Sequence, residues 1–316
     1  MNGIKLIEIL ARAIYPVVTA YEFEFLKTEA AVQNWLSPCT IYFIVQRPLT
    51  YITNVMDSDG ILYFDITDDR DKTLKVAFDP RASGYADQDD EILIEYQFYK
   101  NEPDKSYPLN DVAAIKFLKE DGEFVVWLTA QKIIYLYLSG RLSATVEGDI
   151  ADFIDYKVHY IGQAFSQEVW ERLTGHEKMQ SILTKEDSFG EKYKKNSYEI
   201  SLLMLSITGY DEANVFPFDE RQPWAGPRPI LHKVKTDKQL ENFFTPALAA
   251  GAPELTNEIE AMLVNSFRPA YNKIKFENYP EIKKGVRSAG YTAAHLRINT
   301  LPATLYTDTH RQDVQI

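Results

Sequence analysis

The sequence predicts an α+β protein with two domains, a mainly β domain over residues 1–130 and a mixed domain over residues 131–316. Three observations support this division. The chain of 316 residues is long enough to bury two separate cores. Short segments rich in β-branched and aromatic residues fill the first part of the chain. After residue 150, strand-like and helical patterns alternate.

The first apolar segment, residues 3–21, predicts an amphipathic helix at the start of the β domain. Lys5, Glu8 and Arg12 interrupt this segment, so it is neither the core of a signal peptide nor a membrane span. We therefore expect no contact with a membrane.

Seven segments then predict the strands of the first domain. Each is short, contains many β-branched or aromatic residues, and is bounded by turn residues. The segments are TIYFIVQ, LTYITNV, ILYFDIT, TLKVAFD, EILIEYQFY, AAIKFL and FVVWLTA. Asp59-Gly60 and Asp121-Gly122 are typical of hairpin turns.

The second part of the chain begins with a predicted strand, KVHYIG, and a helix from about Gln167 to Leu183. An apolar strand follows at residues 200–207. A proline-rich stretch and a short helix near Leu240 then predict an insertion over about residues 210–250. The last predicted helix begins at Pro253, because proline is favoured in the first turn, and ends at Phe267.

The net charge of −12 argues at first against a partner as anionic as nucleic acid. The charge is unevenly distributed, however. Residues 1–150 hold 24 Asp and Glu against 14 Lys and Arg, whereas the chain from residue 221 onward holds 13 basic and 9 acidic residues. A single cysteine excludes an internal disulfide, and the five histidines show no zinc-site spacing. We expect a cytoplasmic location from this cysteine usage.

Arg172 and His176 lie four residues apart on the predicted helix at residues 167–183, beside its apolar side. Gly175 between them weakens the helix by about 1 kcal/mol relative to alanine. In a structural interpretation, Arg172 pairs with a carboxylate of its own helix and His176 is a hydrogen-bonded core residue. In a functional interpretation, both side chains face a phosphate.

Two groups of residues strengthen the functional interpretation. Tyr160-Ile161-Gly162 ends a predicted strand, and Arg172 and His176 follow it on a helix. Glu260-Ala261-Met262-Leu263-Val264 lies on the last helix, and Pro269-Ala270-Tyr271-Asn272 follows that helix. In order and spacing, these segments resemble the motifs of the GIY-YIG nuclease superfamily. The resemblance covers part of residues 130–280 and none of the first domain.

The family's first motif, Gly-Ile-Tyr, normally lies on the strand just before Tyr-Ile-Gly. Here Gly148-Asp149-Ile150 holds that place, without a tyrosine. Ile133-Ile134-Tyr135 is the better candidate, which makes Tyr135 the expected first-motif tyrosine. Tyr137 and Tyr156 are alternatives, and a complete loss of this role is a further one.

The resemblance implies that the second domain is a small α/β unit, in which helices flank a three-stranded antiparallel sheet. Glu260 would hold a Mg²⁺ or Mn²⁺ ion, and Arg172 would contact the scissile phosphate. Lys273 and Lys275 would bind the nucleic-acid backbone. The catalytic residues implied by the resemblance are Tyr135, Tyr160, Arg172, His176, Glu260 and Asn272.

The resulting hypothesis is a metal-dependent endonuclease that hydrolyses phosphodiester bonds in DNA rather than RNA, in a defence, restriction or mobile-element setting. The domain at residues 1–130 would supply targeting, dimerisation or contacts with a partner protein. Two alternatives stay open. One is a nucleic-acid-binding module on the same fold without catalysis, and the other is a protein-interaction protein whose motif matches arise by chance.

Overall fold

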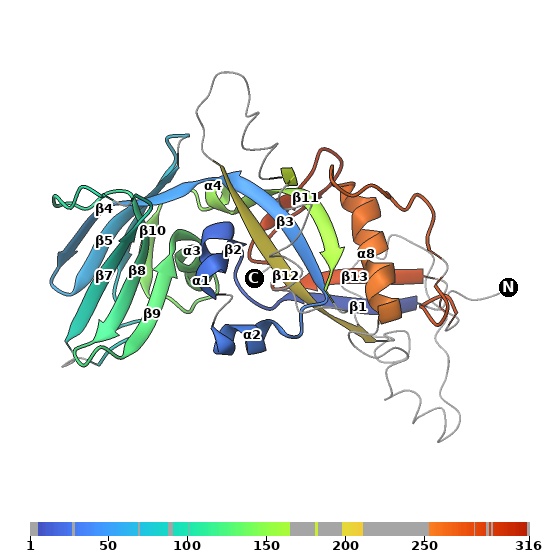
Figure 1. The fold of residues 1–316 in the computed structure, drawn as a ribbon, viewed down its shortest axis with the longest axis horizontal. Coiled ribbons are helices and arrows are strands. Elements are labelled where there is room, and N and C mark those ends of the chain that lie inside the picture. The colour runs from blue at the N-terminus through green and yellow to red at the C-terminus, as the bar shows by residue number, and fades with distance from the viewer. Residues whose placement is uncertain are drawn as a thin grey trace, which may run out of the picture.

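The computed structural model describes residues 6–26, 29–68, 70–87, 91–100, 102–164, 181–182, 198–210, 253–280, 282–288, 291 and 293–314. Over these residues the chain is mostly β and forms two large sheets. Figure 1 shows the sheets at opposite ends of the long axis, with helices between them. The prediction of an α+β protein whose second domain holds a small three-stranded sheet is therefore wrong.

The first sheet, called sheet A, has eight strands in the order β13-β1-β12-β3-β11-β14-β15, and β2 pairs with β12. Strand β3 is antiparallel to both of its neighbours, β11 and β12. The strands are β1 (Leu6–Ala13), β2 (Val18–Thr19), β3 (Ile41–Pro48), β11 (Asp155–Gln163), β12 (Tyr198–Tyr210), β13 (Ala293–Asn299), β14 (Thr304–Tyr306) and β15 (Arg311–Gln312).

The second sheet, called sheet B, has seven strands in the order β10-β6-β5-β4-β8-β7, and β9 pairs with β8. The strands are β4 (Thr50–Ser58), β5 (Ile61–Asp68), β6 (Thr73–Phe78), β7 (Ile92–Phe98), β8 (Val112–Lys119), β9 (Phe124–Thr129) and β10 (Ala144–Glu147). All seven lie between β3 and β11 in the sequence. Sheet B is thus inserted into sheet A, and the sheets do not divide the chain at residue 130.

The described helices are α1 (Ala20–Leu26), α2 (Ala30–Leu36), α3 (Ala130–Leu138), α4 (Ala151–Ile154) and α8 (Pro253–Phe267). The predicted bounds of α8 are confirmed. Of the predicted helix at residues 167–183, only residues 181 and 182 are described, and both are helical. The expected insertion at residues 210–250 lies almost wholly outside the described residues. None of the described helices combines the length and the apolar character needed to cross a membrane.

The N-terminal segment is a strand, so the prediction of an amphipathic helix there is wrong. Strand β1 pairs with β12 on one side and with β13 on the other. Ile7, Ile9 and Ala11 alternate along it and are fully buried in one core. Glu8 points to the opposite face, where its carboxylate lies 3.1 Å from the guanidinium of Arg297. Pairing on both edges outweighs the helical pattern of the isolated segment.

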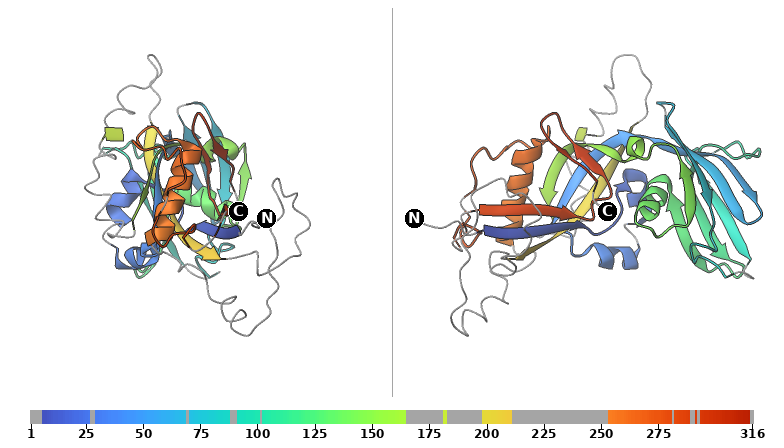
Figure 2. Two further views of the ribbon diagram at one scale, coloured as in Figure 1. Left: turned by 90° about the vertical axis from the view of Figure 1, so that its right-hand side faces the viewer. Right: turned by 180° about the vertical axis from the view of Figure 1, so that it is seen from behind.

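The two faces of sheet A carry separate hydrophobic cores. Helix α8 covers one face, where Leu255, Ile259 and Leu263 pack among side chains of β1, β3 and β12. On the other face, α1 and α2 contribute apolar side chains to a second core, which contains Tyr42. The two views of Figure 2 show α8 on the side of sheet A away from α1. Successive residues of β3 and β12 therefore enter different cores.

A reciprocal capping interaction starts helix α1. The hydroxyl of Thr19 accepts a hydrogen bond from the Glu22 N–H (3.0 Å), and the Glu22 carboxylate accepts one from the Thr19 N–H (2.7 Å). This is the capping-box arrangement. The same carboxylate accepts a hydrogen bond from the hydroxyl of Thr129, which is the N-cap of α3. Glu22 thus ties α1 to the inserted part of the chain.

Candidate tyrosine site

The Tyr160-Ile161-Gly162 segment lies at the end of β11, as the sequence predicts. A β-bulge interrupts the pairing of β11 with β3 between Val158 and Tyr160. Because the extra residue reverses the alternation of side chains, Val158 and Tyr160 enter the cores on opposite faces of sheet A. The bulge at His159 thereby places Tyr160 on the face that carries Tyr42.

Tyr42 on β3 is the tyrosine next to Tyr160. Its backbone is paired with that of Gly162, and the centroids of the Tyr42 and Tyr160 rings lie 6.1 Å apart. A Cβ added to Gly162 would lie only 2.7 Å from the Tyr42 hydroxyl and 2.7 Å from the Tyr160 ring. The glycine therefore makes room for both phenol rings, which is the physical reason for a residue without a side chain there.

The segment after α8 binds β11 beyond the point where β11 pairs with β14. The side-chain amide of Asn272 accepts a hydrogen bond from the Ile161 N–H (3.0 Å) and donates one to the Ile161 carbonyl (2.8 Å). The Tyr271 N–H donates to the His159 carbonyl (3.0 Å). The two motif segments lie 111 residues apart in the sequence, yet they are in direct contact. The side chain of Asn272 therefore bonds to Ile161 in the way that the backbone of a neighbouring strand would.

We expect the Asn272→Ala variant to lower the free energy of unfolding by about 2–4 kcal/mol, because it leaves a buried N–H and a buried carbonyl of Ile161 unpaired. Urea unfolding of the purified protein measures this change. The matched control is Asn110→Ala. Asn110 also bonds one backbone N–H and one carbonyl, but it is exposed, so its loss costs little. Equal effects of the two variants would contradict the assigned role of Asn272.

Arg172 and His176 lie outside the described residues. The next described residues after them, Ser181 and Ile182, are helical, and Ile182 is fully buried in the same core as Tyr42. The helical end of this segment therefore packs on the tyrosine face of sheet A.

Glu260 lies on α8 and is partly exposed. The neighbouring acid on this helix, Glu258, has a different role. It is fully buried, and its carboxylate accepts a hydrogen bond from the Val286 N–H (2.7 Å). Burial raises the pKa of Glu258, as expected for a carboxyl group removed from water. Glu258 therefore anchors the segment around Val286 to α8. Of the two acids, Glu260 is the one that is accessible to solvent.

The two candidate backbone-binding lysines differ in their surroundings. Lys273 is exposed. The Lys275 ammonium donates a hydrogen bond to the Pro269 carbonyl, and the side chain is partly buried. Burial lowers the pKa of Lys275, and Arg268 adds to this effect. Lys275 thus holds the loop after α8 in place, whereas Lys273 is available to a ligand in solvent.

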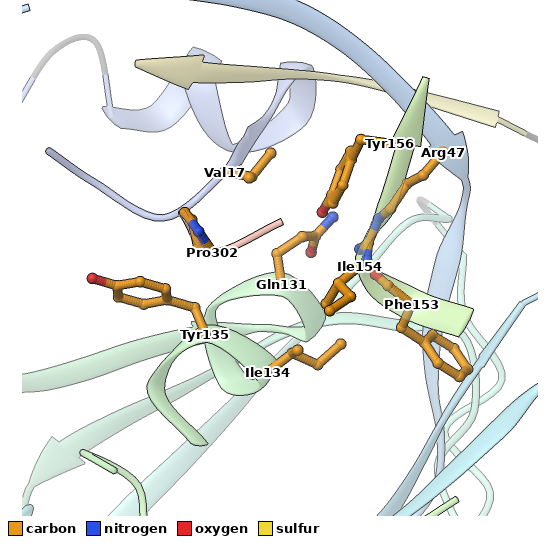
Figure 3. A pocket seen from close by; sticks show the side chains of 9 residues that line it. All are labelled: Val17, Arg47, Gln131, Ile134, Tyr135, Phe153, Ile154, Tyr156 and Pro302. Atoms are coloured by element: carbon orange, nitrogen blue, oxygen red, sulfur yellow. Dashed lines mark hydrogen bonds between the residues drawn. The ribbon is translucent and has the colours of Figure 1, made fainter. Parts of the chain in front are cut away.

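Tyr135 is not part of this tyrosine pair. The segment Ile133-Ile134-Tyr135 lies on helix α3, and Tyr135 packs against the core of sheet B. Figure 3 shows Tyr135 beside a small cavity between the two sheets, which Arg47, Gln131 and Tyr156 also line. The cavity volume is about 10 Å³, roughly the space of one water molecule. Tyr156, an alternative to Tyr135, is likewise buried at this junction, and burial raises its pKa.

A buried ion pair between two strands of sheet A lies beside this cavity, and one hydrogen bond of its arginine reaches sheet B. Arg47, at the end of β3, lies 2.6 Å from the Glu199 carboxylate. Its other nitrogens donate to the Phe153 carbonyl (2.5 Å) and the Thr50 hydroxyl (2.9 Å). The Gln131 amide of α3 donates to the same Glu199 oxygen (2.6 Å). Burial raises the pKa of Glu199 to about 7, although Arg47 acts in the opposite direction.

Among the residues that the structure describes, no group of three or more His, Cys, Asp and Glu is placed to hold a metal ion. A magnesium ion often uses only one or two protein carboxylates and keeps several waters. One partly exposed carboxylate such as Glu260 fits that kind of binding. No protein-family model, curated protein or solved structure matches this chain.

Proposed function

We propose that the protein is a metal-dependent nuclease, with DNA as its substrate, and that its active site lies around Tyr160. The observation that carries this proposal is the contact between the Tyr160–Gly162 segment and Asn272, two segments that resemble GIY-YIG motifs and lie far apart in the sequence. Chance matches to a motif have no reason to meet in the folded chain.

Tyr42 takes the place of the first-motif tyrosine in this proposal. Thr40-Ile41-Tyr42 lies on the strand paired with Tyr160-Ile161-Gly162, with a threonine where the family has glycine. Tyr42 is fully buried, whereas Tyr160 is partly exposed. We therefore assign the substrate-facing hydroxyl to Tyr160 and a positioning role to Tyr42. Asn272 is also a positioning residue, because both groups of its amide are bonded to the backbone of Ile161.

Hydrolysis of a phosphodiester requires positive charge at the phosphate and a group that removes a proton from the attacking water. Arg172 would contact the phosphate oxygens through its planar guanidinium. His176 and Tyr160 would orient the water and accept or relay its proton. A Mg²⁺ or Mn²⁺ ion held by Glu260 would supply further positive charge to the phosphate. Because α8 packs on the face of sheet A opposite Tyr160, the ion and the tyrosine would meet the substrate at the edge of β11.

The distribution of charge is compatible with an anionic substrate. Residues 49–154, which include all of sheet B, hold 21 Asp and Glu against 10 Lys and Arg, whereas the rest of the chain holds 25 against 24. The acidity belongs to the inserted part, which would contact a partner protein or a second copy of the chain. The part that includes the tyrosine site is nearly neutral. The proposal places the enzyme in the cytoplasm.

Incubation of the purified protein with supercoiled plasmid tests the proposal. We expect nicking in Mg²⁺ or Mn²⁺ and none in excess chelator, because the activity depends on the ion. Retention of labelled DNA should weaken steeply as salt rises. Retention without nicking would instead indicate a binding module, and neither retention nor nicking would indicate a protein-interaction role.

A further inference from the structure

The loop at residues 268–276, called the post-helix loop, carries an exposed apolar side chain beside the tyrosine site. Ile274 has 66% of its surface exposed to solvent. Asn272, only two residues earlier, is bonded to Ile161, and two residues of chain span at most about 7 Å. Ile274 is thus held within a short distance of the edge of β11.

The backbone of this loop is fixed, so the exposure of Ile274 does not come from a loosely attached segment. Tyr271 and Asn272 bond to β11, and the Lys275 ammonium closes the loop by donating to the Pro269 carbonyl. At its end, Phe276 packs against the core beneath α8. A single exposed apolar residue is ordinary on a protein surface. Ile274 differs from such a residue because hydrogen bonds and packing hold the loop around it in place, while its own side chain is exposed to solvent.

The charges around Ile274 suit a polyanion. Lys273 is exposed, and the side chain of Arg268 is 46% exposed. The carboxylate of Glu277 lies 3.9 Å from the Arg268 guanidinium. Proteins that bend DNA through the minor groove combine cationic contacts to phosphates with an apolar side chain that enters between two base pairs.

We infer that the post-helix loop inserts Ile274 between base pairs of duplex DNA while Lys273 and Arg268 contact the flanking phosphates. This inference rests on the proposed function and adds a mode of substrate binding to it. Unstacking one step next to the tyrosine site would bend the duplex and bring a backbone phosphate toward Tyr160. The substrate would then be a duplex with an easily unstacked pyrimidine–purine step.

The test uses a short duplex with 2-aminopurine at a TA step, in chelator so that no cleavage occurs. Binding of the parent protein should raise the fluorescence of the base analogue as it unstacks. The Ile274→Ala variant should lose this rise and bind about tenfold more weakly, because it lacks most of the buried apolar surface. The Lys273→Ala variant should keep the rise at saturation, but the slope of its affinity against salt should fall by about one.

Two controls keep the result specific. Leu93→Ala removes an apolar side chain that is 48% exposed on sheet B, far from the loop in the fold, and should bind as the parent does. Ile274→Ala should show the parent's thermal unfolding, because the side chain makes little contact with the core. Parent-like fluorescence and affinity of Ile274→Ala, together with DNA cleavage by the parent, would overturn the insertion alone. Failure of the parent protein to bind DNA would overturn the proposed function as well.

Discussion

Replacing Arg47 with methionine is expected to lower the free energy of unfolding by about 3–5 kcal/mol, because it leaves the buried carboxylate of Glu199 without a cation. Three parts of the chain lose their common partner at once. Arg47 bonds Glu199 of sheet A, Thr50 of sheet B and the carbonyl of Phe153. Urea unfolding at pH 8 measures the change, since most Glu199 is ionised there in the parent protein.

The double variant Arg47→Met/Glu199→Leu is the control for this prediction. It removes both charges, and replacing a whole buried pair by apolar residues costs far less than breaking it. The double variant should therefore be more stable than Arg47→Met alone. A free energy of unfolding for Arg47→Met within about 1 kcal/mol of the parent value would contradict the stabilising role assigned to Arg47.

The same ion pair gives the stability a dependence on pH. The folded-state pKa of Glu199 is raised from 4.5 to about 7, so the unfolded chain releases this proton at a lower pH than the folded one. The contribution of Glu199 to stability is therefore complete below pH 4.5 and is lost as the pH rises toward 7. In Arg47→Met the pKa of Glu199 should rise further, so that the loss of stability extends to higher pH.

The positions of the strands were more predictable from the sequence than the pairing between them. Residues 41–48 and 155–163 form strands because β-branched and aromatic residues favour a paired, half-buried surface. Nothing in the local pattern indicates that these two strands pair with each other, because all of sheet B lies between them in the sequence. The cost of closing a long loop grows only slowly with its length, so sequence distance is a poor guide to pairing. For this reason the local sequence pattern gave no indication that Tyr42 lies beside Tyr160 in the fold.

The first strand was misjudged for a related reason. The segment around Ile7 and Ile9 has charged residues at positions compatible with the polar side of a helix. The carboxylate of Glu8, however, is buried and lies 3.1 Å from the guanidinium of Arg297 on the neighbouring strand. The local periodicity of apolar residues gives no information about a contact between residues this far apart in the chain. Short motifs did draw attention to Asn272 and Gly162, and both meet a geometric need in the fold. Asn272 bonds the backbone of Ile161, and Gly162 leaves room for two phenol rings.

The Glu260→Gln variant should bind DNA as the parent does but lose nearly all cleavage. Removal of a key electrostatic group from an active site typically lowers the rate by about 100- to 1000-fold, and glutamine has no charge with which to hold a divalent cation. Because Glu260 is partly exposed, the substitution should leave the fold intact. Glu254→Gln is the matched control, since Glu254 is a partly exposed acid in the first turn of the same helix.

The most direct test of the account is the rate of Mg²⁺-dependent plasmid nicking by the parent, Glu260→Gln and Glu254→Gln, measured side by side with DNA retention. We expect the parent and Glu254→Gln to nick at equal rates, and Glu260→Gln to retain DNA without nicking it. Nicking by Glu260→Gln at the parent rate would contradict the assignment of the catalytic metal ion to Glu260 on α8.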